Sequence, residues 1–219
     1  MNRLLKKCAT TLSFMMALAT TTTSVAAMDV YLFRGLAGIP FSVGLDDLEN
    51  KLKSYGIRAE THPHESWQRI YNKIRKRGVR EVAFIGHSMG ALSAISLTKK
   101  LRGSGIRVAY LGLIDIPGSG QSAPKNASWA EAYVSSQPGF GPLKVNARHK
   151  NLVVNTRVPK TVHITIDDSS RVHDAIISAV WLAEASVGHA PKTVTAFAAP
   201  VKERKFGLDM INTASISNR

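Results

Sequence analysis

The feature that most constrains this chain is the pentapeptide Gly86-His87-Ser88-Met89-Gly90. It joins a short apolar run, residues 81–85, which indicates a buried strand, to residues 91–101, whose apolar positions recur with a helical period. A turn this tight strains the backbone of the serine and leaves no room for side chains two residues to either side. The pattern therefore predicts a nucleophile elbow that presents Ser88 above a sheet edge. The alternative is an ordinary glycine-rich turn with a surface serine.

Strand-like and helix-like segments alternate on both sides of this turn. The expected strands are residues 29–33, 57–61, 81–85 and 107–115, and the expected helices are residues 42–55, 66–77 and 91–101. Repeated βα units with apolar strands give parallel sheets with right-handed crossovers. The sequence thus predicts an α/β fold in three layers, with a mostly parallel central sheet and helices on both faces.

The pattern loosens after residue 115. Residues 116–150 are rich in Pro, Gly, Ser and Asn, and we expect one edge strand near 131–135 and otherwise a loop over the site. Residues 152–155 and 161–166 are expected to be extended, and residues 171–186 to form a last helix.

The N-terminal 27 residues have the pattern of a secretory signal peptide. Three basic residues precede a mostly apolar stretch, and Val25-Ala26-Ala27 supplies the small residues that a signal peptidase requires. We expect cleavage after Ala27, a single α/β domain over 28–187 and a flexible basic tail over 188–219. An uncleaved membrane anchor is the alternative, although six threonines dilute the apolar stretch. The prediction places the protein outside the bacterial cytoplasm, either secreted or periplasmic.

Charge and cysteine content narrow the chemistry further. Cys8, the single cysteine, lies in the predicted leader, so the mature chain would have no disulfide and no thiol chemistry. The net charge is +14, and removal of the leader leaves 26 Lys and Arg against 15 Asp and Glu, a net charge of +11. Such a field favours anionic partners, and a membrane surface is one candidate. No nucleic-acid motif is present, and a solvated basic face is the simpler interpretation.

A serine hydroxyl needs a base to take its proton and an acid to orient that base. In chains with this kind of elbow, the acid and then the histidine follow the serine. Asp115 fits best because it ends the strand after the elbow helix, and its side chain should emerge at the edge that carries Ser88. Asp115 could instead be a turn former. Asp167 and Asp168 are the alternative acids, but they follow the histidine candidate.

Two histidines compete for the role of base. His163 is followed about eight residues later by the last expected helix, which places it in a loop at the carboxyl edge of the sheet. His173 lies in the first turn of that helix, where its ring would pack or cap. We therefore expect His163 to be the base and keep His173 as the alternative.

An oxyanion hole would complete the site. The backbone N–H of Met89, at the start of the elbow helix, is the expected first donor. Leu36, in the glycine-containing loop after the first strand, is the expected second donor, although this loop could simply be a tight turn. The constellation requires no metal and no cofactor.

These residues make the chain resemble the α/β-hydrolase superfamily, on its small lipase-like and thioesterase-like side. The resemblance rests on Phe33-Arg34-Gly35-Leu36-Ala37-Gly38, the elbow pentapeptide, Asp115 and His163, and it covers about residues 28–186. An acid directly after the elbow helix and strand is similar to thioesterase domains. One departure is Arg34, which stands where many lipases have histidine. Another is the cap, which is shortened to residues 116–150.

The resemblance implies a metal-independent serine hydrolase that cleaves a carboxylic ester or thioester through an acyl-enzyme. Ser88 would attack, His163 would transfer the proton and Asp115 would orient His163, while Met89 and Leu36 would hold the oxyanion. Export and positive charge favour a small-molecule or lipid ester as substrate. The alternative is a non-catalytic binding protein of the cell envelope with the same fold, because fold alone does not establish function.

Overall fold

The computed structural model describes residues 28–36, 42–145 and 151–186. The predicted signal peptide (1–27) and the predicted basic tail (188–219) lie outside the described residues. Among the described residues, no helix has the length and hydropathy needed to span a membrane.

Strands and helices alternate over the first half of the domain, as the sequence predicts. The elements are β1 (Asp29–Arg34), α1 (Gly44–Ser54), β2 (Arg58–Pro63), a short 3-10 helix (His64–Ser66), α2 (Trp67–Arg77), β3 (Glu81–His87), α3 (Met89–Lys100) and β4 (Arg107–Ile114). The predicted boundaries of these helices and strands differ from the observed ones by a few residues at most.

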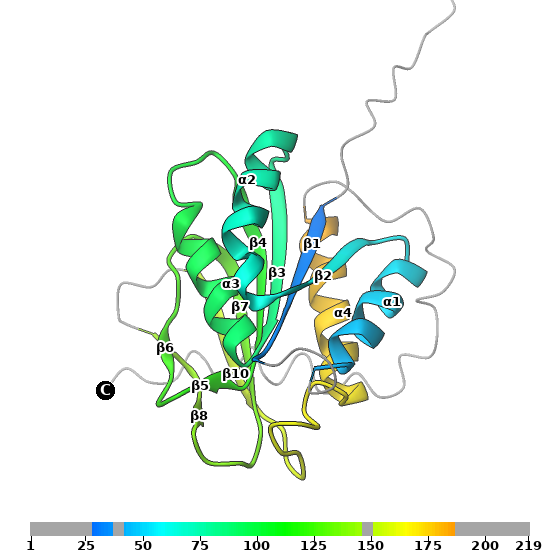
Figure 1. The fold of residues 1–219 in the computed structure, drawn as a ribbon, viewed down its shortest axis with the longest axis vertical. Coiled ribbons are helices and arrows are strands. Elements are labelled where there is room, and N and C mark those ends of the chain that lie inside the picture. Colours follow the sequence, from blue (N-terminus) through cyan, green and yellow to red (C-terminus); the bar gives the residue numbers. More distant parts are fainter. Residues whose placement is uncertain (1–27, 37–41, 146–150, 187–219) are drawn as a thin grey trace, which may run out of the picture.

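The second half is built from short strands and one long helix. The elements are β5 (Ile116–Pro117), β6 (Gln121–Ser122), β7 (Ala127–Val134), β8 (Phe140–Gly141), β9 (Leu143–Lys144), β10 (Leu152–Arg157) and α4 (Ser170–Ala185). The two-residue strands pair only with one another, β5 with β8 and β6 with β9. They form small ribbons beside the main sheet (Figure 1).

The main sheet has six strands in the order β10-β7-β4-β3-β1-β2, and every pairing in it is parallel. All six carboxyl ends therefore meet at one edge, where loops from different parts of the chain converge. The elbow at the end of β3 lies near the middle of this edge.

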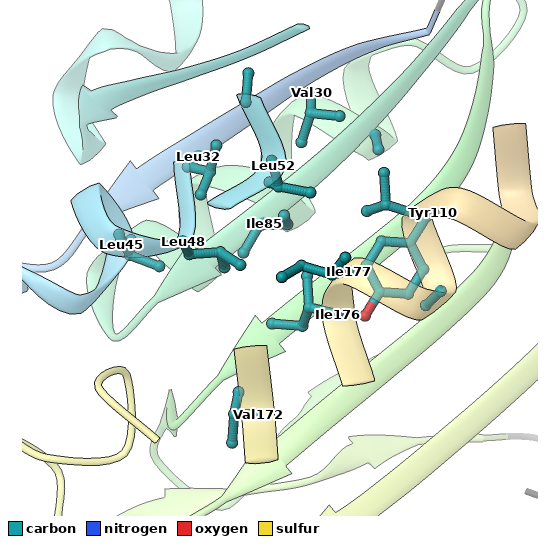
Figure 2. Close-up of a cluster of buried hydrophobic side chains, with 14 of the residues drawn as sticks. Val30, Leu32, Leu45, Leu48, Leu52, Ile85, Tyr110, Val172, Ile176 and Ile177 are labelled. Atoms are coloured by element: carbon teal, nitrogen blue, oxygen red, sulfur yellow. The ribbon is translucent and has the colours of Figure 1, made fainter. Parts of the chain in front are cut away.

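Helices cover both faces of the sheet, which confirms the predicted three layers (Figure 1). α1 and α4 pack on one face, where Leu45, Leu48 and Leu52 of α1 meet Leu32 and Ile85 of the sheet and α4 side chains (Figure 2). α2 and α3 cover the other face, with a separate core that includes Phe84 and Ile74. Successive residues of β1 alternate between the two cores, because strand side chains point to opposite faces.

The prediction of an edge strand near residues 131–135 is wrong. β7 begins earlier, at Ala127, and lies inside the sheet between β4 and β10. The carboxylate of Glu131 accepts hydrogen bonds from the hydroxyls of Tyr110, at 2.9 Å, and Tyr133. Burial raises the pKa of Glu131. Two tyrosine donors thus allow an acidic residue in an internal strand.

The prediction of an extended segment over residues 161–166 is also wrong. The backbone N–H groups of Thr165 and Ile166 both donate to the carbonyl of Val162, so the segment is a turn. The N–H of Val162 donates in turn to the hydroxyl of Thr165 at 3.1 Å. The alternation of apolar and polar residues resembled a strand, whereas local side-chain bonds favour the turn.

Candidate active site

Ser88 lies at the junction of β3 and α3, in the conformation that the elbow requires. Its φ and ψ are 56° and −123°, a strained combination for any residue other than glycine. Its N–H donates to the carbonyl of Ile114 at 2.9 Å, which anchors the elbow to β4. Strain of this kind persists only where the surrounding structure enforces it, and it is typical of functional sites.

The two glycines of the pentapeptide are required by close backbone contacts. A Cβ on Gly90 would lie 1.9 Å from the carbonyl oxygen of Phe33, and one on Gly86 would lie 2.3 Å from the carbonyl oxygen of Gly90. Backbone atoms cannot move away as a flexible side chain could. This confirms the expectation that these two positions must be small.

Ser88, His163 and Asp115 come together although they are far apart in the sequence. His163 Nε2 lies 3.0 Å from Ser88 Oγ, and His163 Nδ1 lies 3.1 Å from Asp115 Oδ2. A carboxylate only accepts, so Nδ1 carries the proton and Nε2 is free to accept from the Ser88 hydroxyl. The structure thus joins the three residues in one hydrogen-bonded line.

Asp115 is held rigidly behind the histidine. It directly follows β4, is fully buried and has a φ of 46°. Its Oδ1 accepts the backbone N–H of Ser135 at 2.7 Å, which leaves Oδ2 for His163. The side chain emerges at the carboxyl edge of the sheet, as expected from its place after the strand.

The His163 ring is enclosed by two other rings. The ring of Phe140, on β8, stacks on it with a centroid separation of 3.9 Å and an interplanar angle of 11°. The ring centroid of His87 lies 4.6 Å away. The backbone N–H of His163 also donates to the side-chain oxygen of Gln137 at 2.9 Å. These contacts fix the position of an imidazole that sits on an otherwise exposed turn.

Ser88 and His163 line an open cleft of about 410 Å³. Its other lining residues are mainly apolar or backbone groups: Gly35, Leu36, Ser42, His87, Met89, Pro117, Phe140 and Ile164. Leu36 is 67% exposed and Ile164 57% exposed, so apolar side chains stand at the mouth of the cleft. Both expected oxyanion donors, Leu36 and Met89, are therefore beside Ser88.

A second polar cluster, which the sequence did not reveal, lies behind Ser88. His87 Nε2 lies 3.0 Å from the carbonyl oxygen of His163, and His87 Nδ1 lies 3.0 Å from Ser42 Oγ. Burial lowers the pKa of His87 to about 4, so the ring is neutral at pH 7. Since a carbonyl only accepts, Nε2 donates and Nδ1 accepts the Ser42 hydroxyl proton.

The direction of every hydrogen bond in this cluster follows. Ser42 Oγ accepts the N–H of Gly35 at 3.2 Å and donates to His87, which donates to His163. We call this series of three bonds the Ser42–His87 relay. It connects the loop after β1, the elbow and the turn that carries His163.

The alternative base and acids lie elsewhere. His173 is buried at the start of α4, with Nε2 donating to the carbonyl of Asp167 at 2.5 Å and Nδ1 2.9 Å from Lys51 Nζ. Asp168 is exposed. Asp167 is buried, and its carboxylate lies 3.9 Å from His87 Nδ1, beyond hydrogen-bond distance. Among the described residues, no hydrogen bond joins the side chain of any of these three residues to Ser88 or to the His163 ring.

Asp167 is buried with neither carboxyl oxygen hydrogen-bonded to another described group. Burial and the neighbouring Asp168 carboxylate raise its pKa from 3.8 to about 7. Nearby backbone N–H groups and His163 oppose this rise only in part. The folded chain therefore binds more protons here than the unfolded chain between about pH 4 and 7, and this group lowers stability as pH rises through that range.

Replacing this carboxyl should remove that pH dependence. Asp167→Asn should be more stable than the wild type by about 2 to 4 kcal/mol at pH 8, with a much smaller difference at pH 4.5. Urea unfolding of the wild type and of Asp167→Asn at the two pH values measures this difference. His87 is present in both chains, so its own titration does not account for a difference between them. Asp168→Asn, an exposed neighbour, should change stability less. An equal difference between wild type and Asp167→Asn at both pH values would contradict the assignment.

Metal binding has no support in the described ranges, 28–36, 42–145 and 151–186. No group of three or more His, Cys, Asp or Glu side chains there is arranged to hold an ion. The Ser88–His163–Asp115 line makes nucleophilic chemistry available through side chains and backbone alone.

Comparison with known proteins agrees with this geometry. A model of the thioesterase domain matches residues 60–135, which include the elbow and Asp115. A gene product of Listeria innocua has a similar structure, with a TM-score of 0.51 and 11% identity over 69% of this chain and 92% of that one. The type II thioesterase BorB of the borrelidin biosynthetic cluster has a TM-score of 0.50 and 12% identity over 71% of this chain and 93% of that one.

The fold of the chain is therefore similar to that of these proteins, and part of its sequence is similar to the thioesterase domain. The structural similarities establish the fold, and the thioesterase match supports hydrolysis of an ester bond as the kind of activity. No curated protein matches the sequence.

Proposed function

We propose that this chain is a serine hydrolase of the α/β-hydrolase superfamily, and that it cleaves carboxylic esters or thioesters through a Ser88–His163–Asp115 triad. The observation that carries the proposal is the line of two hydrogen bonds, 3.0 and 3.1 Å long, that ends at Ser88 in an apolar cleft. It supplies a nucleophile, a base and a group that orients the base.

The reaction proceeds in two halves. Ser88 Oγ attacks the substrate carbonyl carbon while His163 Nε2 takes the hydroxyl proton, and Asp115 stabilises the imidazolium. The tetrahedral intermediate collapses to an acyl-enzyme as His163 returns the proton to the leaving alcohol or thiol. Water then attacks the acyl-enzyme with His163 as base, and the acid is released from a regenerated Ser88.

The oxyanion is held by backbone N–H groups. Met89 is the first residue of α3, where N–H groups have no partner within the helix. The partial positive charge of the helix N-terminus adds to its effect. Leu36 supplies the second donor from the loop after β1. The preceding residue, Gly35, donates its N–H to Ser42 Oγ, and this bond fixes the start of the loop that carries Leu36.

The Ser42–His87 relay positions both loops of this machinery. Ser42→Ala removes the acceptor of Gly35 N–H and the donor to His87, a loss of about 1 to 2 kcal/mol. We expect kcat to fall about 5- to 30-fold, with KM changed less than about threefold, because the reacting groups remain. Ser54→Ala, whose hydroxyl bonds only the carbonyl of Lys51 at the surface, is the matched control. Equal kcat for wild type and Ser42→Ala would refute the positioning role.

The cleft favours an apolar acyl group. Leu36, Met89, Pro117, Phe140 and Ile164 contribute its apolar lining. We further propose that the chain acts outside the bacterial cytoplasm, after removal of the leader, on a small-molecule or lipid ester. The net charge of +11 that remains after removal of the leader supports a substrate or surface that carries negative charge.

A matched substrate series tests the proposal. The purified chain is assayed with oxygen esters and thioesters of the same acyl groups, from two to sixteen carbons, with stopped-flow detection of the leaving group. For substrates whose acylation is faster than hydrolysis of the acyl-enzyme, we expect a burst equivalent to one leaving group per chain. We also expect a kcat/KM that rises with acyl length. No turnover of any member by the folded chain would favour the binding-protein alternative.

A further inference from the structure

The first described residue, Met28, is buried against the end of the last helix, α4. Met28 is 3% exposed, and its backbone N–H donates to Glu184 Oε1 at 3.3 Å. Glu184 is 5% exposed and lies in the last turn of α4, 156 residues away in the sequence. This bond joins the start of β1 to the end of the last helix.

Glu184 presents its carboxylate in a buried position near the C-terminal end of α4. A hydrogen bond to a carboxylate is stronger when its donor carries a positive charge. A charged nitrogen at the position of the Met28 N–H would therefore bind Glu184 more strongly than the neutral N–H does.

Processing of the leader would place a positive charge at this nitrogen. The predicted cleavage site follows Ala27, so Met28 would become the first residue of the mature chain. Hydrolysis breaks the Ala27–Met28 amide bond. Water supplies the oxygen of the new Ala27 carboxylate, and the Met28 nitrogen takes up protons to become an α-ammonium, whose ordinary pKa is about 8.

We propose that Glu184 is the acceptor for the N-terminus created by cleavage between Ala27 and Met28. Leader removal converts a neutral hydrogen bond into a buried ion pair that ties β1 to α4. The mature chain is therefore more stable than the precursor. Only a cut at this bond places the ammonium beside Glu184, because cleavage one residue to either side moves it by about 3.5 Å. The proposal does not depend on the hydrolase activity.

Four chains form the test. The first chain comprises residues 28–219, and its translation starts at Met28 itself. The initiator methionine is not removed from this chain, because the second residue, Asp29, has a large side chain. The second chain carries Ala26 and Ala27 ahead of Met28 after removal of an added initiator. The other two carry Glu184→Gln in these same backgrounds, which keeps the side-chain shape and removes its charge.

Thermal unfolding at pH 7 is measured on all four. With Glu184 present, the chain that starts at Met28 should have a Tm about 3 to 8 °C above that of the extended chain. With Glu184→Gln the difference should fall below about 1 °C. Equal Tm values in the Glu184 pair, or a difference that persists in the Glu184→Gln pair, would overturn the proposal.

The location of the cut is checked separately, without any variant. The full precursor is expressed with export, and the N-terminus of the exported chain is sequenced. The expected first residue is Met28. Any other first residue, or an exported chain that retains the leader, would overturn the proposal even if the Glu184→Gln chains fail to fold.

Discussion

Ser88→Ala is expected to lower kcat for ester hydrolysis by about 10⁴- to 10⁶-fold. The change removes only the hydroxyl that His163 deprotonates, so the cleft, the backbone donors and the base remain. Alanine has the same backbone limits as serine at a φ of 56°, and the fold should be unchanged. Initial-rate assays on the best substrate of the acyl series measure the effect.

Ser96→Ala is the matched control for this prediction. It lies in the same helix as Met89, and its hydroxyl donates only to the carbonyl of Leu92 at 2.8 Å. Its kcat should stay within about twofold of the wild type. A Ser88→Ala chain that retained one per cent of wild-type kcat would show that another group is the nucleophile.

Asp115→Asn is expected to lower kcat by about 10³- to 10⁴-fold while the chain stays folded. The amide oxygen can still accept the N–H of Ser135 at 2.7 Å, so the buried side chain keeps one partner. The amide NH₂ then faces His163 Nδ1 and donates to it. The proton is forced onto Nε2, the atom that must accept from Ser88, and the base is lost.

Two measurements separate this effect from damage to the fold. The Tm of Asp115→Asn reports stability, and Asp168→Asn, the exposed alternative acid, should keep kcat within about threefold of the wild type. Activity of Asp115→Asn should recover partly at higher pH if hydroxide replaces the lost base. Wild-type activity in Asp115→Asn with loss in Asp168→Asn would reverse the assignment of the acid.

The parts of the site that were predictable from the sequence are those set by local geometry or by strand ends. The elbow is local, since Gly86 and Gly90 are needed within five residues. Asp115 follows from parallel topology, because the carboxyl ends of β3 and β4 share an edge. His163 was identified by its position before the last helix, although its own segment is a turn rather than the expected strand.

The parts that were not predictable depend on contacts between distant segments. β7 is internal because Tyr110, on another strand, supplies a hydroxyl to Glu131. The Ser42–His87 relay spans 45 residues between Ser42 and His87 and 76 between His87 and His163. Phe140 reaches the His163 ring through the β5–β8 ribbon. No local sequence pattern predicts such contacts, because only the folded chain brings the partners together.

The most direct test of the account asks whether Ser88 is an activated nucleophile. The folded chain is treated with a fluorophosphonate, which forms a covalent bond with activated serines, and its intact mass is measured beside that of Ser88→Ala. The account predicts one adduct per chain in the wild type and none in Ser88→Ala. An unlabelled wild type, or equal labelling of both chains, would contradict it.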